Sequence, residues 1–166
     1  MKKLYLMRHA KSSWKKPLPD HERPLKKRGR KAAKEMGKAL KKAGIFPDLI
    51  LSSDALRAKQ TALLVAEELG LPSEKIRLEP RLYEADLSQI LHVIQNVENS
   101  VDSILLVAHN PGISEAAVAL SREERFSWMK TAQIVGLAWD VEGWDRIEGK
   151  KGKVIFEAAP GRTPKR

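Results

Sequence analysis

The sequence has no cysteine among its 166 residues. This absence excludes disulfide bonds, thiolate nucleophiles and metal sites built on cysteine. Histidine is scarce as well, and the four histidines are not arranged as a zinc motif. We therefore expect a protein that uses neither a bound metal nor another cofactor.

Long apolar runs are also missing. The run from Leu4 to Met7 meets Arg8 at once and is too short for a signal peptide or a membrane span, so we expect a cytoplasmic protein that does not enter a membrane. Hydrophobic residues make up 42% of the chain, which suits one domain over residues 1–166. Within it, residues from about 160 to 166 are expected to form a mobile tail.

Negative charge is in short supply, because 31 Lys and Arg residues face 21 Asp and Glu residues and give a formal net charge of +10. A positive field suits a nucleic acid, a membrane surface or an acidic substrate. Much of the excess lies between Lys26 and Lys42 at helical spacing, where a solvated helix face is the simpler explanation. No basic stripe carries interleaved aromatic residues, so we expect no nucleic-acid partner.

Short apolar runs alternate with amphipathic segments through the first two-thirds of the chain. This order predicts an α/β fold with a mostly parallel sheet covered on both faces. The last two predicted strands are close enough to pair antiparallel. The predicted strands are residues 4–7, 48–51, 104–108, 133–139 and 153–156, and the predicted helices are 26–43, 54–69, 87–97 and a segment starting at Pro111.

Polar residues follow three of these strands and should meet at one edge of the sheet. Arg8 and His9 follow the first strand, and His109 follows the third. Arg57 falls in the first turn of the helix after the second strand, where the residues 52–54 are candidate caps. No acidic residue adjoins any of the four in sequence, so we predict an anion site.

The residue types at this edge suit phosphoryl transfer. The planar guanidinium group of arginine matches phosphate oxygens and stays charged at any working pH. A neutral histidine can attack phosphorus and divide hydrolysis into formation and breakdown of a phosphoenzyme. Among the predicted residues, His9 beside Arg8 is best placed to attack, while Arg57 and His109 would stabilise the charge of the transferring group.

Three segments resemble the signatures of the histidine phosphatase superfamily. Residues 6–12, Leu-Met-Arg-His-Ala-Lys-Ser, resemble its arginine-histidine motif; residues 52–61 resemble its second arginine motif, and residues 106–112 its second histidine motif. Arg23-Pro24-Leu25, Gly29 and Leu82-Tyr83 extend the resemblance to the small phosphohistidine phosphatase branch, the SixA type. The resemblance covers nearly the whole chain.

The resemblance implies a three-layer α/β/α sandwich in which His9 is the nucleophile and Arg8, Arg57 and His109 bind the phosphoryl group. Glu84 is the candidate for the general acid that larger relatives use to protonate an alkoxide leaving group. Further candidate contacts to substrate are Lys11, Ser12 and Arg23.

The strands leave little room for extra helices that would roof the site. A shallow site suits a phosphorylated side chain on another protein, and with the resemblance it favours phosphohistidine on a histidine phosphotransfer protein. We expect a monomer. Two alternatives stay open: a phosphatase of small-molecule phosphate esters that uses Glu84, and a basic binding protein whose phosphatase site is vestigial.

Overall fold

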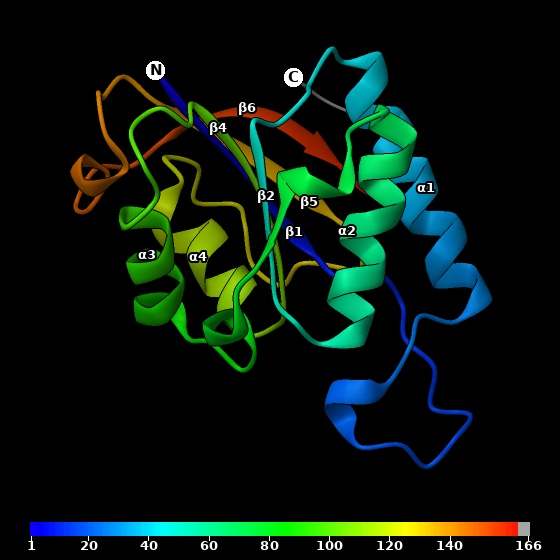
Figure 1. The fold of residues 1–166 in the computed structure, drawn as a ribbon. Helices are drawn as coiled ribbons and strands as arrows, with labels where there is room; N and C mark the ends of the chain where they lie inside the picture. Colours follow the sequence, from blue (N-terminus) through cyan, green and yellow to red (C-terminus); the bar gives the residue numbers. More distant parts are fainter. Residues whose placement is uncertain (163–166) are drawn as a thin grey trace.

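A six-stranded sheet forms the centre of the computed structural model, which describes residues 1–162 (Figure 1). The strand order across the sheet is β3-β2-β4-β1-β5-β6. In chain order the strands are β1 (Lys2–Arg8), β2 (Leu49–Ser52), β3 (Ile76–Leu78), β4 (Ser103–Ala108), β5 (Ile134–Trp139) and β6 (Lys153–Ala158).

β1 lies between a parallel neighbour, β4, and an antiparallel neighbour, β5. β2 pairs in parallel with β3 and β4, and β6 pairs antiparallel with β5. Only β5 therefore opposes the common direction of the other five strands. The predicted α/β class, the mostly parallel sheet and the antiparallel pairing of the last two strands are confirmed.

Two pairs of helices cover the sheet, one pair on each face (Figure 1). The helices are α1 (Lys27–Lys42), α2 (Leu56–Leu69), α3 (Leu87–Gln95) and α4 (Gly112–Leu120). Side chains alternate along β1: Leu4 and Leu6 pack with α3 and α4, whereas Tyr5 and Met7 pack with α1 and α2. The result is the three-layer sandwich that the resemblance implied.

Glycines end the first two helices as the sequence predicted. Gly44 and Gly70 have φ values of 73° and 68°, which side chains with a Cβ atom adopt at a cost. The start of α2 differs from the prediction, because its N-cap is Ala55 and no side chain caps it. The expected cap by residues 52–54 was wrong, since the Ser53 hydroxyl contacts His109 and the Asp54 carboxylate contacts His21.

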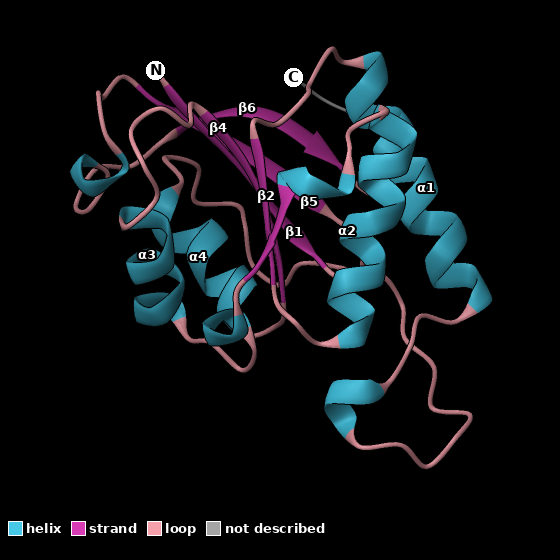
Figure 2. Ribbon diagram, in the orientation of Figure 1, coloured by secondary structure: helices cyan, strands magenta, loops and turns pink. Residues whose placement is uncertain are grey.

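The sequence pattern missed β3, and four short 3-10 turns complete the fold. β3 has three residues at the sheet edge, with Arg77 in the middle and partial exposure throughout, so it carries no apolar run. The turns are η1 (Asp20–Glu22), η2 (Ser73–Lys75), η3 (Pro80–Leu82) and η4 (Trp144–Arg146). η1 lies in the otherwise irregular connection between β1 and α1 (Figure 2).

Strand pairing brings the predicted polar residues to one edge. Arg8 is level with Ala108 in the β1–β4 register, and the amide of His9 donates to the Ala108 carbonyl oxygen at 3.0 Å. From the other side, the amide of Ala132 donates to the carbonyl oxygens of Arg8 and His9. The backbone that carries these residues is therefore fixed from both sides.

Of the predicted C-terminal tail, residues 163–166 lie outside the described part of the chain. The amide of Gly161 donates to a carboxylate oxygen of Glu35 at 2.6 Å. None of the helices within residues 1–162 combines the length and the apolar character that crossing a membrane requires.

Candidate active site

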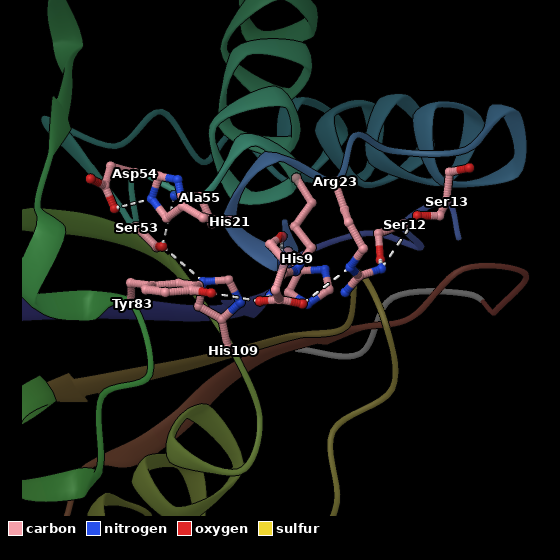
Figure 3. Close-up of polar contacts among 12 residues, drawn as sticks. His9, Ser12, Ser13, His21, Arg23, Ser53, Asp54, Ala55, Tyr83 and His109 are labelled. Atoms are coloured by element: carbon pink, nitrogen blue, oxygen red, sulfur yellow. Dashed lines mark hydrogen bonds and ion pairs between the residues drawn. The ribbon is translucent and has the colours of Figure 1, made fainter. Parts of the chain in front are cut away.

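His9 follows β1 directly and is the residue predicted to attack phosphorus (Figure 3). Its side chain is 7% exposed, and its Nδ1 lies 2.7 Å from the Ala10 carbonyl oxygen. A carbonyl oxygen can only accept, so Nδ1 carries the proton of the neutral ring and Nε2 keeps its lone pair. This contact therefore selects the tautomer that can attack through Nε2.

The charge state of His9 also suits a nucleophile. Burial lowers the pKa of His9 to about 4; the hydrogen bond to Ala10 opposes this shift, and the charges of Arg57 and Arg8 add to it. An ordinary histidine has a pKa of about 6.5. At neutral pH the ring of His9 is uncharged, so no separate base has to remove a proton before attack.

His109 follows β4, and its ring centroid lies 5.0 Å from that of His9. Its Nε2 lies 2.8 Å from the Ser53 hydroxyl oxygen, which accepts a hydrogen bond from the Ala55 amide at 3.2 Å. When Ser53 donates its hydroxyl proton to Nε2, Nδ1 carries the ring proton. Burial lowers the pKa of His109 to about 3, so this ring is also neutral.

The two arginines are anchored by their terminal nitrogens. Nη1 of Arg8 donates to the Met129 carbonyl oxygen at 3.0 Å. Nη1 of Arg57 donates to the Asp20 carbonyl oxygen at 2.7 Å, and its Nη2 donates to the Asp20 carboxylate at 3.0 Å. Both guanidinium groups are thereby held before any substrate arrives.

Three buried nitrogens have no hydrogen-bond partner among the described residues: Nε of Arg8, Nε of Arg57 and Nδ1 of His109. All three residues line one cavity together with His9. A buried donor without a partner costs roughly 1–3 kcal/mol, and more when it is charged. The two arginine nitrogens are donors that suit an anion bound in this cavity, and we call Arg8, His9, Arg57 and His109 the phosphoryl site.

The cavity has a volume of about 290 Å³ and brings together seven of the eight predicted site residues. Ser12 accepts a hydrogen bond from Nη1 of Arg23 at 2.7 Å, so these two residues form one wall. The carbonyl group of Lys11 lies against α1 at Gly29, where a Cβ atom would come within 2.0 Å of its oxygen. Only glycine at that position lets the loop after His9 pass so close.

Glu84 is the predicted residue that does not line the cavity. It is exposed and has a φ of 57°, in a turn between η3 and α3. Tyr83 faces the site instead, with its ring edge against His109 at 5.6 Å between centroids. The geometry of the site therefore does not support Glu84 as a general acid.

Asp20 is the residue that sequence reasoning missed. Its carboxylate pairs with Arg57 and, at 3.1 Å, with Nε of Arg23, and it accepts a hydrogen bond from the Tyr83 hydroxyl at 2.6 Å. These donors, Tyr83 foremost, hold the pKa of Asp20 well below its usual range, and the hydrogen bond to Asp20 raises the pKa of Tyr83 to about 12. Asp20 is not adjacent in sequence to any residue of the phosphoryl site, so a comparison of sequence neighbours alone did not identify it; the Asp20–Arg23 spacing within one turn was the available signal.

A second missed residue is Thr61, which is fully buried in α2. Its hydroxyl accepts from the Ala10 amide at 3.0 Å and donates to the Arg57 carbonyl oxygen at 2.8 Å. Thr61 thus ties the loop after His9 to the helix that carries Arg57. Within residues 1–162, no three His, Asp or Glu side chains are grouped as they would be around a metal ion.

Comparisons with known proteins agree with this geometry. The model of the histidine phosphatase superfamily (branch 1) matches residues 4–94. An uncharacterized chloroplastic protein of Arabidopsis thaliana is 35% identical over 129 residues, which are 72% of this chain and 59% of that protein. The chain therefore belongs to the histidine phosphatase superfamily, and it spans less than two-thirds of that plant relative.

Solved structures narrow the class to the SixA type. The protein histidine phosphatase SixA, complexed with tungstate, is 25% identical with a TM-score of 0.81, covering 95% of this chain and 97% of that one. A putative phosphohistidine phosphatase SixA from Agrobacterium tumefaciens is 28% identical with a TM-score of 0.82, covering 96% and 99%. The chain is a phosphatase of the histidine phosphatase type.

Proposed function

We propose that the protein removes phosphoryl groups from phosphohistidine on another protein, through a covalent intermediate on His9. The observation that carries this proposal is the pair of unpartnered buried donors of Arg8 and Arg57, with the unpartnered Nδ1 of His109, around a neutral histidine whose Nε2 is free. The tungstate complex of a SixA relative supports it, because tungstate is a tetrahedral oxyanion like phosphate.

In the first step, Nε2 of His9 attacks the phosphorus and the bond from phosphorus to the substrate imidazole breaks. When that imidazole is protonated on its other nitrogen, it leaves as a neutral ring and needs no further proton. Phosphorylated His9 keeps its Nδ1 proton on the Ala10 carbonyl oxygen, so the ring is cationic and the new bond is labile. The donors of the phosphoryl site stabilise the equatorial oxygens during transfer.

In the second step, water attacks the phosphorus and the bond to His9 breaks. Both protons of the water leave with the phosphate as the monoanion, and His9 returns to its neutral form. Neither step consumes a proton from a general acid. This balance supports phosphohistidine as the substrate, because none of the residues lining the cavity is Asp or Glu.

Hydrolysis of an alkyl phosphate ester, unlike that of phosphohistidine, requires a proton donor for the leaving group. The leaving alkoxide must take up a proton, and Glu84, the candidate donor, is exposed and outside the cavity lining. An ester with a weakly basic leaving group, such as an aryl phosphate, avoids this demand. We therefore propose that aryl phosphates are accepted as artificial substrates and that alkyl phosphates are poor ones.

The test compares wild type with His9→Ala on a phosphohistidine-bearing protein and on an aryl phosphate, both in the presence of a chelator. We expect phosphate release from both by wild type, a preference for phosphohistidine, and a loss of at least about 10³-fold in the variant. Rapid quenching into alkaline denaturant should trap phosphate on His9. Preference for alkyl phosphates would favour the small-molecule alternative, and no release at all would favour the vestigial site.

A further inference from the structure

A groove adjoins the cavity of the phosphoryl site. It has a volume of about 590 Å³, and Trp14 and Lys26 line both the groove and the cavity. The groove therefore runs outward from the place where phosphorus reacts. Its lining residues are Ser13, Trp14, Lys15, Pro24, Leu25, Lys26, Lys27 and Arg30.

The groove carries only positive charge. Lys15, Lys26, Lys27 and Arg30 line it, no Asp or Glu does, and we call these four residues the basic tract. Within the described part of the chain, none of the four forms an ion pair. Some exposed arginines elsewhere are paired, as Arg77 is with Glu98 at 3.1 Å, whereas others, such as Arg122, form no ion pair with a described residue. The basic tract is thus a surface on which the protein itself supplies no counter-charge.

Trp14 gives the groove a fixed aromatic wall. It is 77% exposed, and its ring lies over the guanidinium group of Arg23 at 3.5 Å to the centroid. Arg23 is itself 6% exposed and is held by Asp20 and Ser12. A large aromatic side chain that stays exposed in a fixed position is typical of an interaction surface.

We propose that the basic tract and Trp14 bind an acidic segment next to the phosphohistidine of the protein substrate; this inference rests on the proposed function. A phosphoryl group on a protein can reach the phosphoryl site only if the neighbouring residues lie over the rim of the cavity. Trp14 and Lys26 form part of that rim. A segment that continues past them enters a groove that offers four cations and an aromatic wall, which suits carboxylates interspersed with apolar side chains.

The volume and the lining of the groove favour a polypeptide over a second phosphate group. Its volume is about twice that of the cavity, and its walls include Leu25, Pro24 and the ring of Trp14 besides the four cations. A small polyanion would use the cations and leave the apolar wall uncovered. An extended acidic segment would use both.

The test uses Lys15→Glu/Lys27→Glu, two exposed positions outside the phosphoryl site. The matched control is Lys34→Glu/Lys38→Glu, also exposed and on α1 but outside the groove lining. The substrates are two histidine-phosphorylated peptides, one with Asp and Glu beside the phosphohistidine and one with Asn and Gln there. An aryl phosphate reports the integrity of the phosphoryl site in every variant.

We expect wild type and the control to prefer the acidic peptide by roughly tenfold in kcat/KM, and the groove variant to lose that preference. All three should turn over the aryl phosphate within about twofold of one another, because neither substitution touches the phosphoryl site. Loss of the preference in the groove variant alone would establish the docking surface.

Other results overturn the inference in distinguishable ways. Equal turnover of both peptides by wild type would refute docking while leaving the proposed function intact. An equal loss of the preference for the acidic peptide in the groove variant and the control would mean that the preference comes from the net charge of the protein and not from the groove. If tripolyphosphate competes strongly with the neutral peptide in wild type but not in the groove variant, and no peptide preference exists, the groove binds a small polyanion. Wild type that hydrolyses neither peptide would refute the proposed function itself.

Discussion

The phosphoryl site and the basic tract lie side by side and are both rich in positive charge, yet they hold that charge differently. Arg57 is 6% exposed and bonded to Asp20 by two nitrogens, whereas Lys15 and Lys27 are exposed and have no ion-pair partner within residues 1–162. Fixed, buried charge favours a transition state because it needs no reorganisation. Exposed, flexible charge attracts a partner and is screened by salt.

This difference predicts that changes in the phosphoryl site lower the turnover of every substrate. Arg57→Ala should lower kcat by roughly 10²–10³ on both an aryl phosphate and a phosphohistidine peptide. Arg57→Lys should recover less than about a tenth of the lost activity, because an ammonium group cannot bond Asp20 and also supply the planar fork. Full recovery by lysine would mean that charge alone matters, and the contrast with the basic tract would fail.

Acid should disable the phosphoryl site by protonating His9, the proposed nucleophile. The pKa of His9 is lowered to about 4, so kcat/KM should stay level from neutral pH to about pH 5 and then fall by about tenfold per unit below pH 4. Rates on an aryl phosphate, corrected for ionisation of the substrate, measure this. A midpoint near the ordinary value of about 6.5 would contradict the burial argument.

The same shifts make stability depend on pH. His9 and His109 have pKa values of about 4 and about 3 in the folded protein, below the ordinary histidine value. As the pH falls below about 6.5, the unfolded chain binds protons that the folded protein does not, so the free energy of unfolding decreases down to about pH 4 for the contribution of His9 and about pH 3 for that of His109. Denaturant titrations of wild type and His109→Gln should show a smaller decrease in the variant.

Asp20 tests how far preorganisation matters within the phosphoryl site. Asp20→Asn removes the charge that orients Arg57, so kcat should fall by roughly tenfold. KM should stay level or fall, because the loss of a carboxylate makes the site more attractive to an anion. Glu22→Gln, exposed in the same turn, is the matched control and should change neither kcat nor KM. Equal changes in both parameters would point to general disruption instead.

The smallest effect should come from salt acting on the basic tract. Raising the ionic strength from about 0.05 M to about 0.3 M should lower kcat/KM on the acidic peptide by a few-fold, since exposed charges are screened over such distances. The value of kcat/KM on the neutral peptide should fall less, because this peptide contacts only the charges of the phosphoryl site. A larger response by the neutral peptide would reverse the contrast between the two regions.

Residues with strong local patterns were predictable from the sequence. Leu4 to Met7 and 104–108 are apolar runs that end in polar residues, and parallel strands deliver such ends to one edge. Arg57 was expected in the first turn of its helix, and α2 begins at Leu56. Where a periodic pattern and a sharp boundary coincide, local sequence is enough to place a residue.

Residues fixed by distant contacts were not predictable in this way. Asp20 accepts a hydrogen bond from Arg57, which lies 37 positions later in the chain. The residues next to Asp20 in the sequence give no indication of so distant a partner. The expected capping role of residues 52–54 failed because Ser53 and Asp54 bond His109 and His21 from other segments, while the Ser52 hydroxyl donates to the Ser53 carbonyl oxygen. β3 has only three residues and one apolar neighbour on each side of Arg77, too little for a pattern.

The pairing of β1 bears on how the protein folds during synthesis. Lys3 pairs with Ser103 and Lys2 with Trp139, so the first strand in chain order waits for partners that are made much later. Contacts of such long range slow folding and expose apolar segments meanwhile. His9 therefore acquires its ordered surroundings only once the chain has passed β5, and we expect no phosphatase activity from a nascent chain that ends before β5.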